Sequence, residues 1–424
     1  MLVEKKRLIE LLAHEDNRVV RAASEALEKF FYGSGDVIEH LLKALDINKS
    51  DLDESLLAAR IKYFIPTDND LLEILRLIIE LEDKADVASS NISWHLMNSL
   101  LEFPFQLLEK NYSSFSSNKG LLSIFEIAKN QAEVKNLEPA VLWEKLEKIC
   151  RQYRDKEMER DDDEYCELLV KALSQKGEKI KQKVMMYLSQ EDMNDYHLEF
   201  YLVKLAGKLR IKETIPHLFR ILINSDPLEF VYSQSIEALG KIGTPEVVEE
   251  IDSLYLSHKE LRNSFAEILK YIPHDYSEKL ALKLLGKEND TEAKTFLAGA
   301  LCDIFSINSG ELIIDIIRKK QYEPSIMELP DYLIPVYAYH NKTIDNLAEL
   351  EREDKEFRDE HYHTHHPIFK IAKQVKPSED DDAIEDEESE PFDIDMEDNQ
   401  RGTKKLPMSR IPSKKRYKKK KKKG

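Results

Sequence analysis

The 424-residue chain has few cysteines, few glycines and no long apolar run. Its three cysteines, Cys150, Cys166 and Cys302, form no CxxC pair and fall within helical patterns, which predicts buried reduced thiols. No run of about 18 apolar residues occurs, so no transmembrane segment is predicted. The N-terminus enters a polar helical pattern without a secretory cleavage site. These absences favour a cytoplasmic protein.

Catalytic signatures are missing as well. The sequence contains no Gly-x-Ser-x-Gly, no phosphate-binding Walker loop and no His-Glu-x-x-His. Acidic residues are so numerous that any two can be paired by eye, so no nucleophile and base stand out. The sequence therefore predicts a protein that is not an enzyme and carries no cofactor.

The net charge is -18, and it resides in the body of the chain. Residues 379–398 hold thirteen acids and residues 401–423 hold thirteen bases, so the two blocks cancel. An acidic body argues against wrapping duplex nucleic acid, because that requires many basic side chains on one surface. It favours basic or mixed partners instead.

One helix-turn-helix unit between residues 214 and 251 has both of its ends marked. Its first helix is apolar at i, i+3, i+4 and i+7, and the turn Asn224-Ser225-Asp226-Pro227 ends it. The second helix has Val231, Ser235, Ala238 and Leu239 along one side. It stops at Gly243, where glycine suits a left-handed C-terminal residue, and Thr244-Pro245 begins the next helix.

This unit resembles a HEAT repeat, in which an Asp-Pro turn precedes a second helix reading Val-(3)-Ala-(2)-Ala-Leu-Gly-Lys-Ile-Gly. The chain departs from the family at Tyr232, where arginine is usual, and at Ser235, where alanine is usual. The resemblance implies an all-α fold, an α-solenoid of stacked antiparallel helix pairs. It also implies binding to another protein, without naming the partner.

The second-helix pattern, an apolar or small residue at i, i+4, i+7 and i+8, recurs along the chain. Its regular occurrences begin at Leu198, Val231, Leu261 and Ala293, which are 33, 30 and 32 residues apart. A period of about 20 to 50 residues is typical of a stacked array. With two earlier occurrences, the sets are Val19, Ala23, Ala26 and Leu27; Ile92, Leu96, Ser99 and Leu100; Leu198, Leu202, Leu205 and Ala206; Val231, Ser235, Ala238 and Leu239; Leu261, Phe265, Ile268 and Leu269; and Ala293, Leu297, Ala300 and Leu301.

The spacing divides the chain into four regions. Residues 1–190 are predicted to form irregular HEAT-like repeats, with a Ser- and Asn-rich loop at 112–120 and a charged helical stretch at 151–164. Residues 191–350 form the regular repeats, and the last pair is expected to cap the array with a polar outer face. A His-rich charged hinge at 351–376 and a disordered acidic-then-basic tail at 377–424 follow.

Four histidines in six residues are the only candidate metal ligands, namely His361, His363, His365 and His366. On a helix the first and third share a face, and neutral imidazole suits zinc or a similar ion. No cysteine or carboxylate completes a known ligand spacing. A polar hinge ending at Pro367 is the alternative, and the prediction is that no metal binds.

The C-terminal tail carries dense positive charge around one aromatic ring. Its candidate contact residues for RNA, the ribosome or another anionic partner are Lys414, Lys415, Arg416, Tyr417, Lys418 and Lys419. An anionic membrane surface, an import receptor, or a purely solubilising role are the alternatives. The segment also resembles the end of a SEC-C motif, but lysines replace its final cysteines and no zinc binding is expected. That resemblance implies a bacterial cytosolic protein near ribosomes or the export machinery.

The function predicted from these features is that of a noncatalytic scaffold or adaptor, whose helical array holds a protein partner while the basic tail adds an electrostatic contact. The alternative is a nucleic-acid- or ribosome-associated factor bound through the tail. Alkylpurine DNA glycosylases also use HEAT-like arrays, with tryptophan and tyrosine in a basic groove. Here the body is acidic, and Trp94 and Trp143 are expected to be core anchors.

Overall fold

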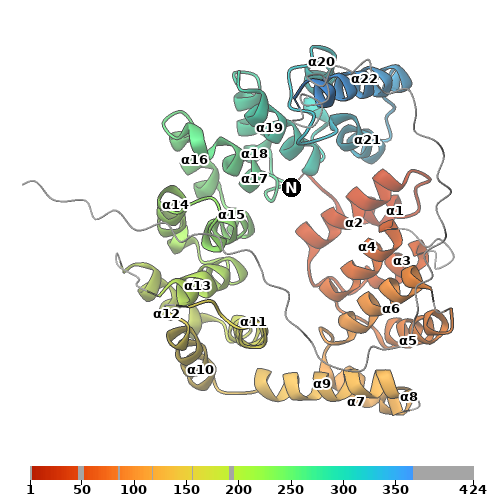
Figure 1. The fold of residues 1–424 in the computed structure, drawn as a ribbon, viewed down its shortest axis with the longest axis vertical. Coiled ribbons are helices and arrows are strands. Elements are labelled where there is room, and N and C mark those ends of the chain that lie inside the picture. The colour runs from red at the N-terminus through yellow and green to blue at the C-terminus, as the bar shows by residue number, and fades with distance from the viewer. Residues whose placement is uncertain are drawn as a thin grey trace, which may run out of the picture. The chain divides into compact units, whose positions relative to one another are not determined.

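The computed structural model describes residues 2–45, 52–84, 86–116, 118–154, 156–190 and 195–365. Throughout these ranges the chain is all-α, and no strand occurs in them (Figure 1). None of the helices described there is long and apolar enough to cross a membrane. The described residues all belong to one compact unit, 1–370.

Twelve helices precede residue 190 in the described part of the chain: α1 (Lys5–Leu11), α2 (Asn17–Phe31), α3 (Ile38–Ala44), α4 (Leu52–Arg60), α5 (Asp68–Glu82), α6 (Val87–Leu100), α7 (Phe105–Lys110), α8 (Tyr112–Ser116), α9 (Lys119–Lys135), α10 (Pro139–Gln152), α11 (Arg160–Ser174) and α12 (Glu178–Leu188). A short 3-10 helix, η1 (Ile61–Tyr63), follows α4.

Ten more helices follow, again among the described residues: α13 (Tyr196–Lys208), α14 (Ile215–Asn224), α15 (Phe230–Ile242), α16 (Pro245–Leu254), α17 (Arg262–Leu269), α18 (Asp275–Leu285), α19 (Thr291–Asp303), α20 (Gly310–Arg318), α21 (Leu329–Tyr339) and α22 (Leu347–His365). Short 3-10 helices precede three of them, η2 (Lys212–Thr214), η3 (Lys259–Leu261) and η4 (Ile307–Ser309).

The repeating sequence pattern marks the buried face of each second helix. Every residue of the six predicted sets is buried, including Ser99 and Ser235, whose hydroxyls donate to backbone carbonyls one turn earlier. The predicted punctuation is also confirmed, because α14 ends at Asn224 and Gly243 has a left-handed φ of 58°. Pro245 then begins α16. Local sequence therefore predicts both the helix ends and the faces they bury in this region.

Two glycines let neighbouring second helices approach closely. A Cβ added to Gly207 of α13 would lie 2.7 Å from Cα of Ala238 in α15. One added to Gly240 of α15 would lie 2.6 Å from Cβ of Tyr271, just after α17. Contacts this short do not occur between real side chains, so the packing of α13, α15 and the segment after α17 depends on these glycines.

The region before residue 190 is less regular than the one after it. The prediction of a loop at 112–120 is wrong, because this segment contains α8 and the start of α9. Phe115 of α8 is fully buried, and its ring lies 5.5 Å from that of Phe125. The expected charged helix at 151–164 is also interrupted, since α10 ends at Gln152 and α11 begins at Arg160. At Phe115, burial of an aromatic side chain thus outweighs the preference of the neighbouring serines for a loop.

The second helices of successive pairs pack against one another in chain order, and the series closes on itself. The order of contacts is α2, α4, α6, α9, α11, α13, α15, α17, α19 and α21, after which α21 contacts α2 (Figure 1). The expectation of a terminal cap with a polar outer face is therefore wrong for α21. Its Leu329, Leu333 and Val336 are buried, because the N-terminal pair covers the array there.

Polar contacts fasten this closure. Arg7 donates from Nε to the Tyr339 carbonyl over 2.8 Å, and the Glu4 amide donates to the Tyr339 hydroxyl over 2.7 Å. Arg18 bridges Asp331 at 2.9 Å and Glu351 at 2.8 Å through one guanidinium nitrogen. These contacts join residues more than 300 positions apart, so no local sequence pattern announces them.

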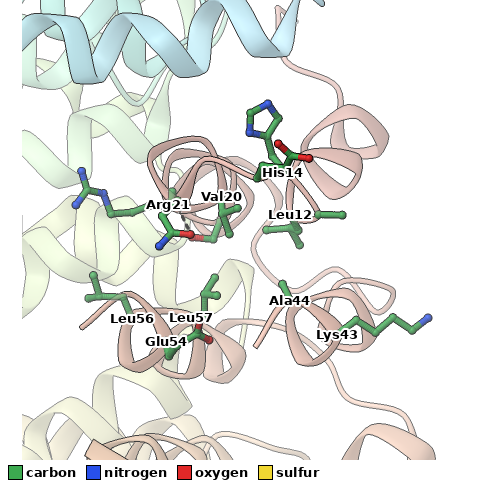
Figure 2. Close-up of a pocket in the computed structure, with 13 residues that line it drawn as sticks. Leu12, His14, Val20, Arg21, Lys43, Ala44, Glu54, Leu56 and Leu57 are labelled. Atoms are coloured by element: carbon green, nitrogen blue, oxygen red, sulfur yellow. Dashed lines mark hydrogen bonds between the residues drawn. The ribbon is translucent and has the colours of Figure 1, made fainter. Parts of the chain in front are cut away.

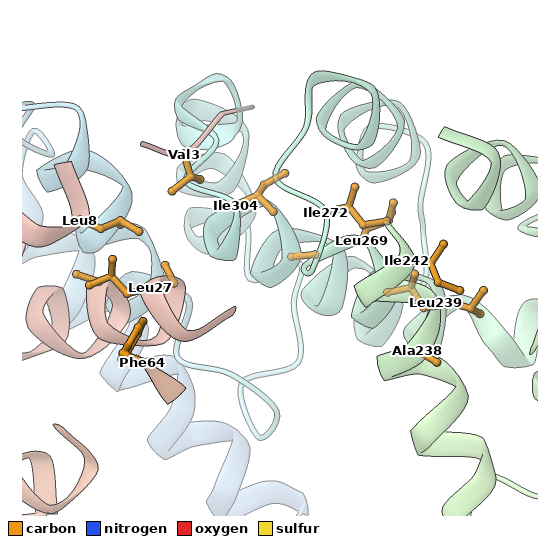
Figure 3. Close-up of a cluster of buried hydrophobic side chains, with 14 of the residues drawn as sticks. Val3, Leu8, Leu27, Phe64, Ala238, Leu239, Ile242, Leu269, Ile272 and Ile304 are labelled. Carbon is orange, nitrogen blue, oxygen red and sulfur yellow. The ribbon is translucent and has the colours of Figure 1, made fainter. Parts of the chain in front are cut away.

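The hydrophobic core runs through the closure without interruption. Val3 and Leu8 of the N-terminal pair belong to the same cluster of buried side chains as Leu269 and Ile304 of the regular region. Figure 3 shows part of this cluster, with Leu239 and Ile242 of α15 beside Leu269 and Ile272. The three cysteines are free and buried, as predicted.

Candidate functional site

The predicted His cluster falls at the end of α22. The segment expected to be a hinge is helical as far as His365, and residues beyond it are outside the described ranges. His361 Nε2 lies 3.0 Å from Glu323 Oε1, and its ring contacts Phe357. His363 and His365 are in the helix, but their side chains, like His366, are outside the described set. Metal binding stays a hypothesis.

Within the part of the chain that the structure describes, no three histidine, cysteine, aspartate or glutamate side chains are grouped closely enough to hold a metal ion. The tail residues proposed to contact anions, Lys414, Lys415, Arg416, Tyr417, Lys418 and Lys419, all lie outside the described ranges. The candidate sites that the structure describes are therefore surfaces and cavities of the helical unit.

A cavity of about 260 Å³ lies between the first two helix pairs (Figure 2). Leu12, Val20 and Leu57 form apolar parts of its wall, while Arg21 and Lys43 are among the charged residues that line it. Small-molecule sites are usually larger and mostly apolar, with a few convergent polar groups. This cavity has neither the size nor the lining that such a site favours.

Charged side chains on the second helices are largely neutralised by their neighbours. Arg60, almost fully buried, lies 2.7 Å from Glu25 of the preceding pair, and Lys29 lies 3.1 Å from Asp303. Lys204 pairs with Glu167 of α11 over 2.5 Å. Such pairs between adjacent helices fix their register more than they add free energy, because desolvation opposes the Coulombic gain. We therefore assign these charges to packing.

Four ring-bearing residues and one lysine lie on elements of the N-terminal region that pack together, since η1 contacts α6 and the end of α2 is bonded to η1. They are Tyr32, Lys62, Tyr63, Trp94 and His95, hereafter called the aromatic surface. Trp94 is 61% exposed, so the expectation that it anchors the core is wrong, whereas Trp143 is buried as predicted. Tyr32, just after α2, is 64% exposed. Tyrosine and tryptophan are enriched at protein interfaces, because each has a large apolar ring and a polar group.

Ring contacts connect the members of the aromatic surface. The ring centroids of Tyr32 and Tyr63 are 6.1 Å apart, and Nζ of Lys62 lies 4.9 Å from the Tyr63 centroid. Trp94 and His95 are 4.8 Å apart, edge to face. Burial lowers the pKa of His95, and the nearby charge of Lys62 adds to this effect.

The local backbone holds this surface in place. The Gly33 amide donates to the Tyr63 carbonyl over 2.9 Å, which ties the end of α2 to η1. Burial raises the pKa of Tyr63 to about 12, with the charge of Glu28 adding to the effect, so this phenol stays neutral. The aromatic surface thus offers rigid, uncharged rings beside one lysine.

Sequence reasoning missed this surface although a signal was present. Trp94 lies midway between the buried Ile92 and Leu96, about 200° around the helix from each, and must point away from the core they share. Comparison with known proteins adds no assignment. The chain matches no protein-family model and no curated protein.

Proposed function

We propose that this chain is a noncatalytic scaffold or adaptor, a HEAT-like α-solenoid that binds another protein through the aromatic surface. The observation that carries the proposal is the exposure of two aromatic side chains, Tyr32 and Trp94, on elements that pack together. The ring of Tyr32 contacts that of Tyr63, and the ring of Trp94 contacts that of His95. Tryptophan and tyrosine dominate the binding energy of protein interfaces, because each buries a large area at a low cost in side-chain entropy.

The helical pairing supports a HEAT-like assignment. Six second helices bury the same four positions, and in the unit at 214–251 an Asp-Pro turn joins α14 to α15 and Gly243 ends α15. Arrays of this kind present extended surfaces to macromolecules. Buried free cysteines are consistent with a cytoplasmic location, which belongs to the proposal.

The basic tail is proposed as a second, salt-sensitive contact. Two contacts on one chain raise avidity without a new site, provided that both can be engaged together. The alternative function, a nucleic-acid- or ribosome-associated factor, rests on the lysine-rich sequence at 404–424. In that case the tail supplies the affinity and the helical unit only positions it.

The experiment that separates these functions is affinity capture from the native cell. The baits are the full chain, a chain ending at Asp398, and Trp94→Ser in the full chain, each with and without nuclease. The matched control is Val87→Ser, because Val87 is 79% exposed on the same helix but outside the aromatic surface.

We expect the same partners in the full chain, the truncated chain and the Val87→Ser control, and their depletion by about tenfold or more in Trp94→Ser, since interface tryptophans often contribute at least 2 kcal/mol. If the partners vanish with the tail or with nuclease, the nucleic-acid function replaces the scaffold. If Trp94→Ser captures as well as Val87→Ser, the aromatic surface is not the binding site.

A further inference from the structure

A second exposed surface lies at the turn between α14 and α15, far along the chain from the aromatic surface. Leu228 is 91% exposed and Phe230 is 72% exposed. Together with Tyr196, Glu199, Asp226 and Glu229 they form what we call the turn surface. Val231, which follows Phe230, is buried, so the register of α15 turns Phe230 away from the core. Leu228 lies in the turn that precedes this helix.

The turn is held in shape by its own hydrogen bonds. The Leu228 amide donates to Asp226 Oδ1 over 2.9 Å, and the Phe230 amide donates to the Tyr196 hydroxyl over 3.0 Å. The second bond joins the turn to α13 of the preceding pair. The backbone that displays Leu228 and Phe230 is therefore fixed, which lowers the entropic cost of binding to them.

Acidic side chains flank the two apolar residues. Burial raises the pKa of Glu199, and repulsion from Glu229 adds to the rise, although Arg220 partly opposes it. The Arg220 guanidinium donates instead to the carbonyls of Leu188, over 3.0 Å, and Gln190. Within the described ranges, neither glutamate nor Asp226 has a basic nitrogen within ion-pairing distance, in contrast to the paired charges of the second helices.

We propose that the turn surface is a docking site for a positively charged protein segment that carries an apolar anchor. The anchor covers Leu228 and Phe230, and lysine or arginine side chains beside it pair with Glu199 and Glu229. A cation placed there relieves the repulsion between the two carboxylates. Because Glu199 is already partly removed from water, pairing it with a cation costs less additional desolvation. The net charge of -18 adds long-range steering of such a segment.

The same features oppose other occupants. Nucleic acid is repelled by the acidic flank, because phosphates require basic side chains. A second copy of this turn brings like charges together, since a symmetric contact places the same acids on both sides. An acidic segment meets the same repulsion. Charge complementarity thus selects a basic partner, and the exposed apolar pair distinguishes it from a purely electrostatic one.

The test measures the fluorescence anisotropy of a labelled lysine-rich peptide with a central pair of leucines, titrated with the full-length protein. The variants are Leu228→Ser with Phe230→Ser, and Glu199→Gln with Glu229→Gln. The charge-matched control is Glu109→Gln with Glu133→Gln, which removes two exposed acids from other helices. A second peptide has serines in place of the leucines. Circular dichroism melting checks that each variant is folded.

We expect both turn-surface variants to weaken binding of the leucine peptide about tenfold or more, and the control to change it less than about threefold. The serine peptide should bind the wild type weakly and lose little in the Leu228→Ser, Phe230→Ser variant. Equal weakening by both acid-removing variants overturns the proposal in favour of diffuse attraction to the body. If the two peptides bind the wild type equally well, the leucines do not contribute to binding, and the proposal is overturned as well. Because no residue of the aromatic surface takes part, the outcome is independent of the capture experiment.

Discussion

From α13 onward, neighbouring second helices come unusually close to one another at Gly207 and Gly240, whereas before α13 the helices are of uneven length and Tyr32 and Trp94 are exposed. The contrast is clearest between Gly207, packed against Ala238, and Trp94, exposed on α6. Helix α6 buries the same four positions as the later second helices and exposes Trp94 on its other side. The two regions therefore differ in how closely their second helices approach, and not in which face they bury.

The largest effect that tests this comparison is expected at Gly207. The added Cβ of Gly207→Ala meets the backbone of Ala238 at 2.7 Å, so α13 and α15 must separate. We expect the free energy of unfolding to fall by about 2 to 3 kcal/mol in chemical denaturation, as overpacked sites commonly do.

The matched control is Gly35→Ala, in the N-terminal region, where an added Cβ has nothing within 4 Å. This change should be neutral or slightly stabilising, because alanine reduces the entropy of the unfolded chain. Equal destabilisation by the two substitutions would contradict the view that close helix approach is specific to the regular region.

A smaller effect is expected at the closure between the two regions. Arg18→Met removes a guanidinium that bridges Asp331 and Glu351. Because Arg18 is partly exposed, we expect a loss of about 1 kcal/mol at low salt, which shrinks as salt screens the pairs. Hydrogen exchange should rise in α2 and α21 together.

Arg76→Met is the control for this prediction. Among the described residues Arg76 pairs with Glu73 and Glu80 of its own helix, so its loss should cost a few tenths of a kcal/mol and leave exchange in α21 unchanged. A rise in exchange confined to α2 in Arg18→Met would show that the closure does not depend on this bridge.

The smallest predicted effect concerns pH and the aromatic surface. Burial and Lys62 lower the pKa of His95 below its ordinary 6.5. The unfolded state then binds a proton more readily than the folded state, so stability is full above pH 6.5 and falls as the pH drops through that value. Thermal melts between about pH 7.5 and 5.5 should show this loss for the wild type, reduced by a few tenths of a kcal/mol in His95→Gln. The same slope in both proteins would assign the loss to other groups.

Periodic burial explains how much of the fold could be predicted from the sequence. A residue such as Ala238 or Leu297 lies one turn from its buried neighbours, so the pattern predicts both the helix and its face. The segment around Phe115 could not be predicted in this way, because its serines favour a loop locally and the helix is stabilised by packing on α9, where Phe125 contacts both Tyr112 and Phe115.

The sites were harder to predict than the helices. The exposure of Trp94 follows from its register, but residue type alone suggested a core position. The turn surface could not be predicted from the sequence, because the hydrogen bond from the Phe230 amide to the Tyr196 hydroxyl joins two different helix pairs. The contact between α2 and α21 could not be predicted either, because Arg18 and Asp331 are 313 positions apart and polar contacts leave no periodic pattern in the sequence.

The closed order of packing also bears on how such a chain can change in evolution. Open arrays lengthen or shorten by tandem duplication or loss of whole units, because each unit contacts only its neighbours. Here an extra pair inserted between α15 and α17 would carry α21 away from α2 and part Arg18 from Asp331, which now lie 2.9 Å apart. Gain or loss of a whole unit would therefore break the contacts between α2 and α21, whereas a change in the length of an exposed turn would leave them intact.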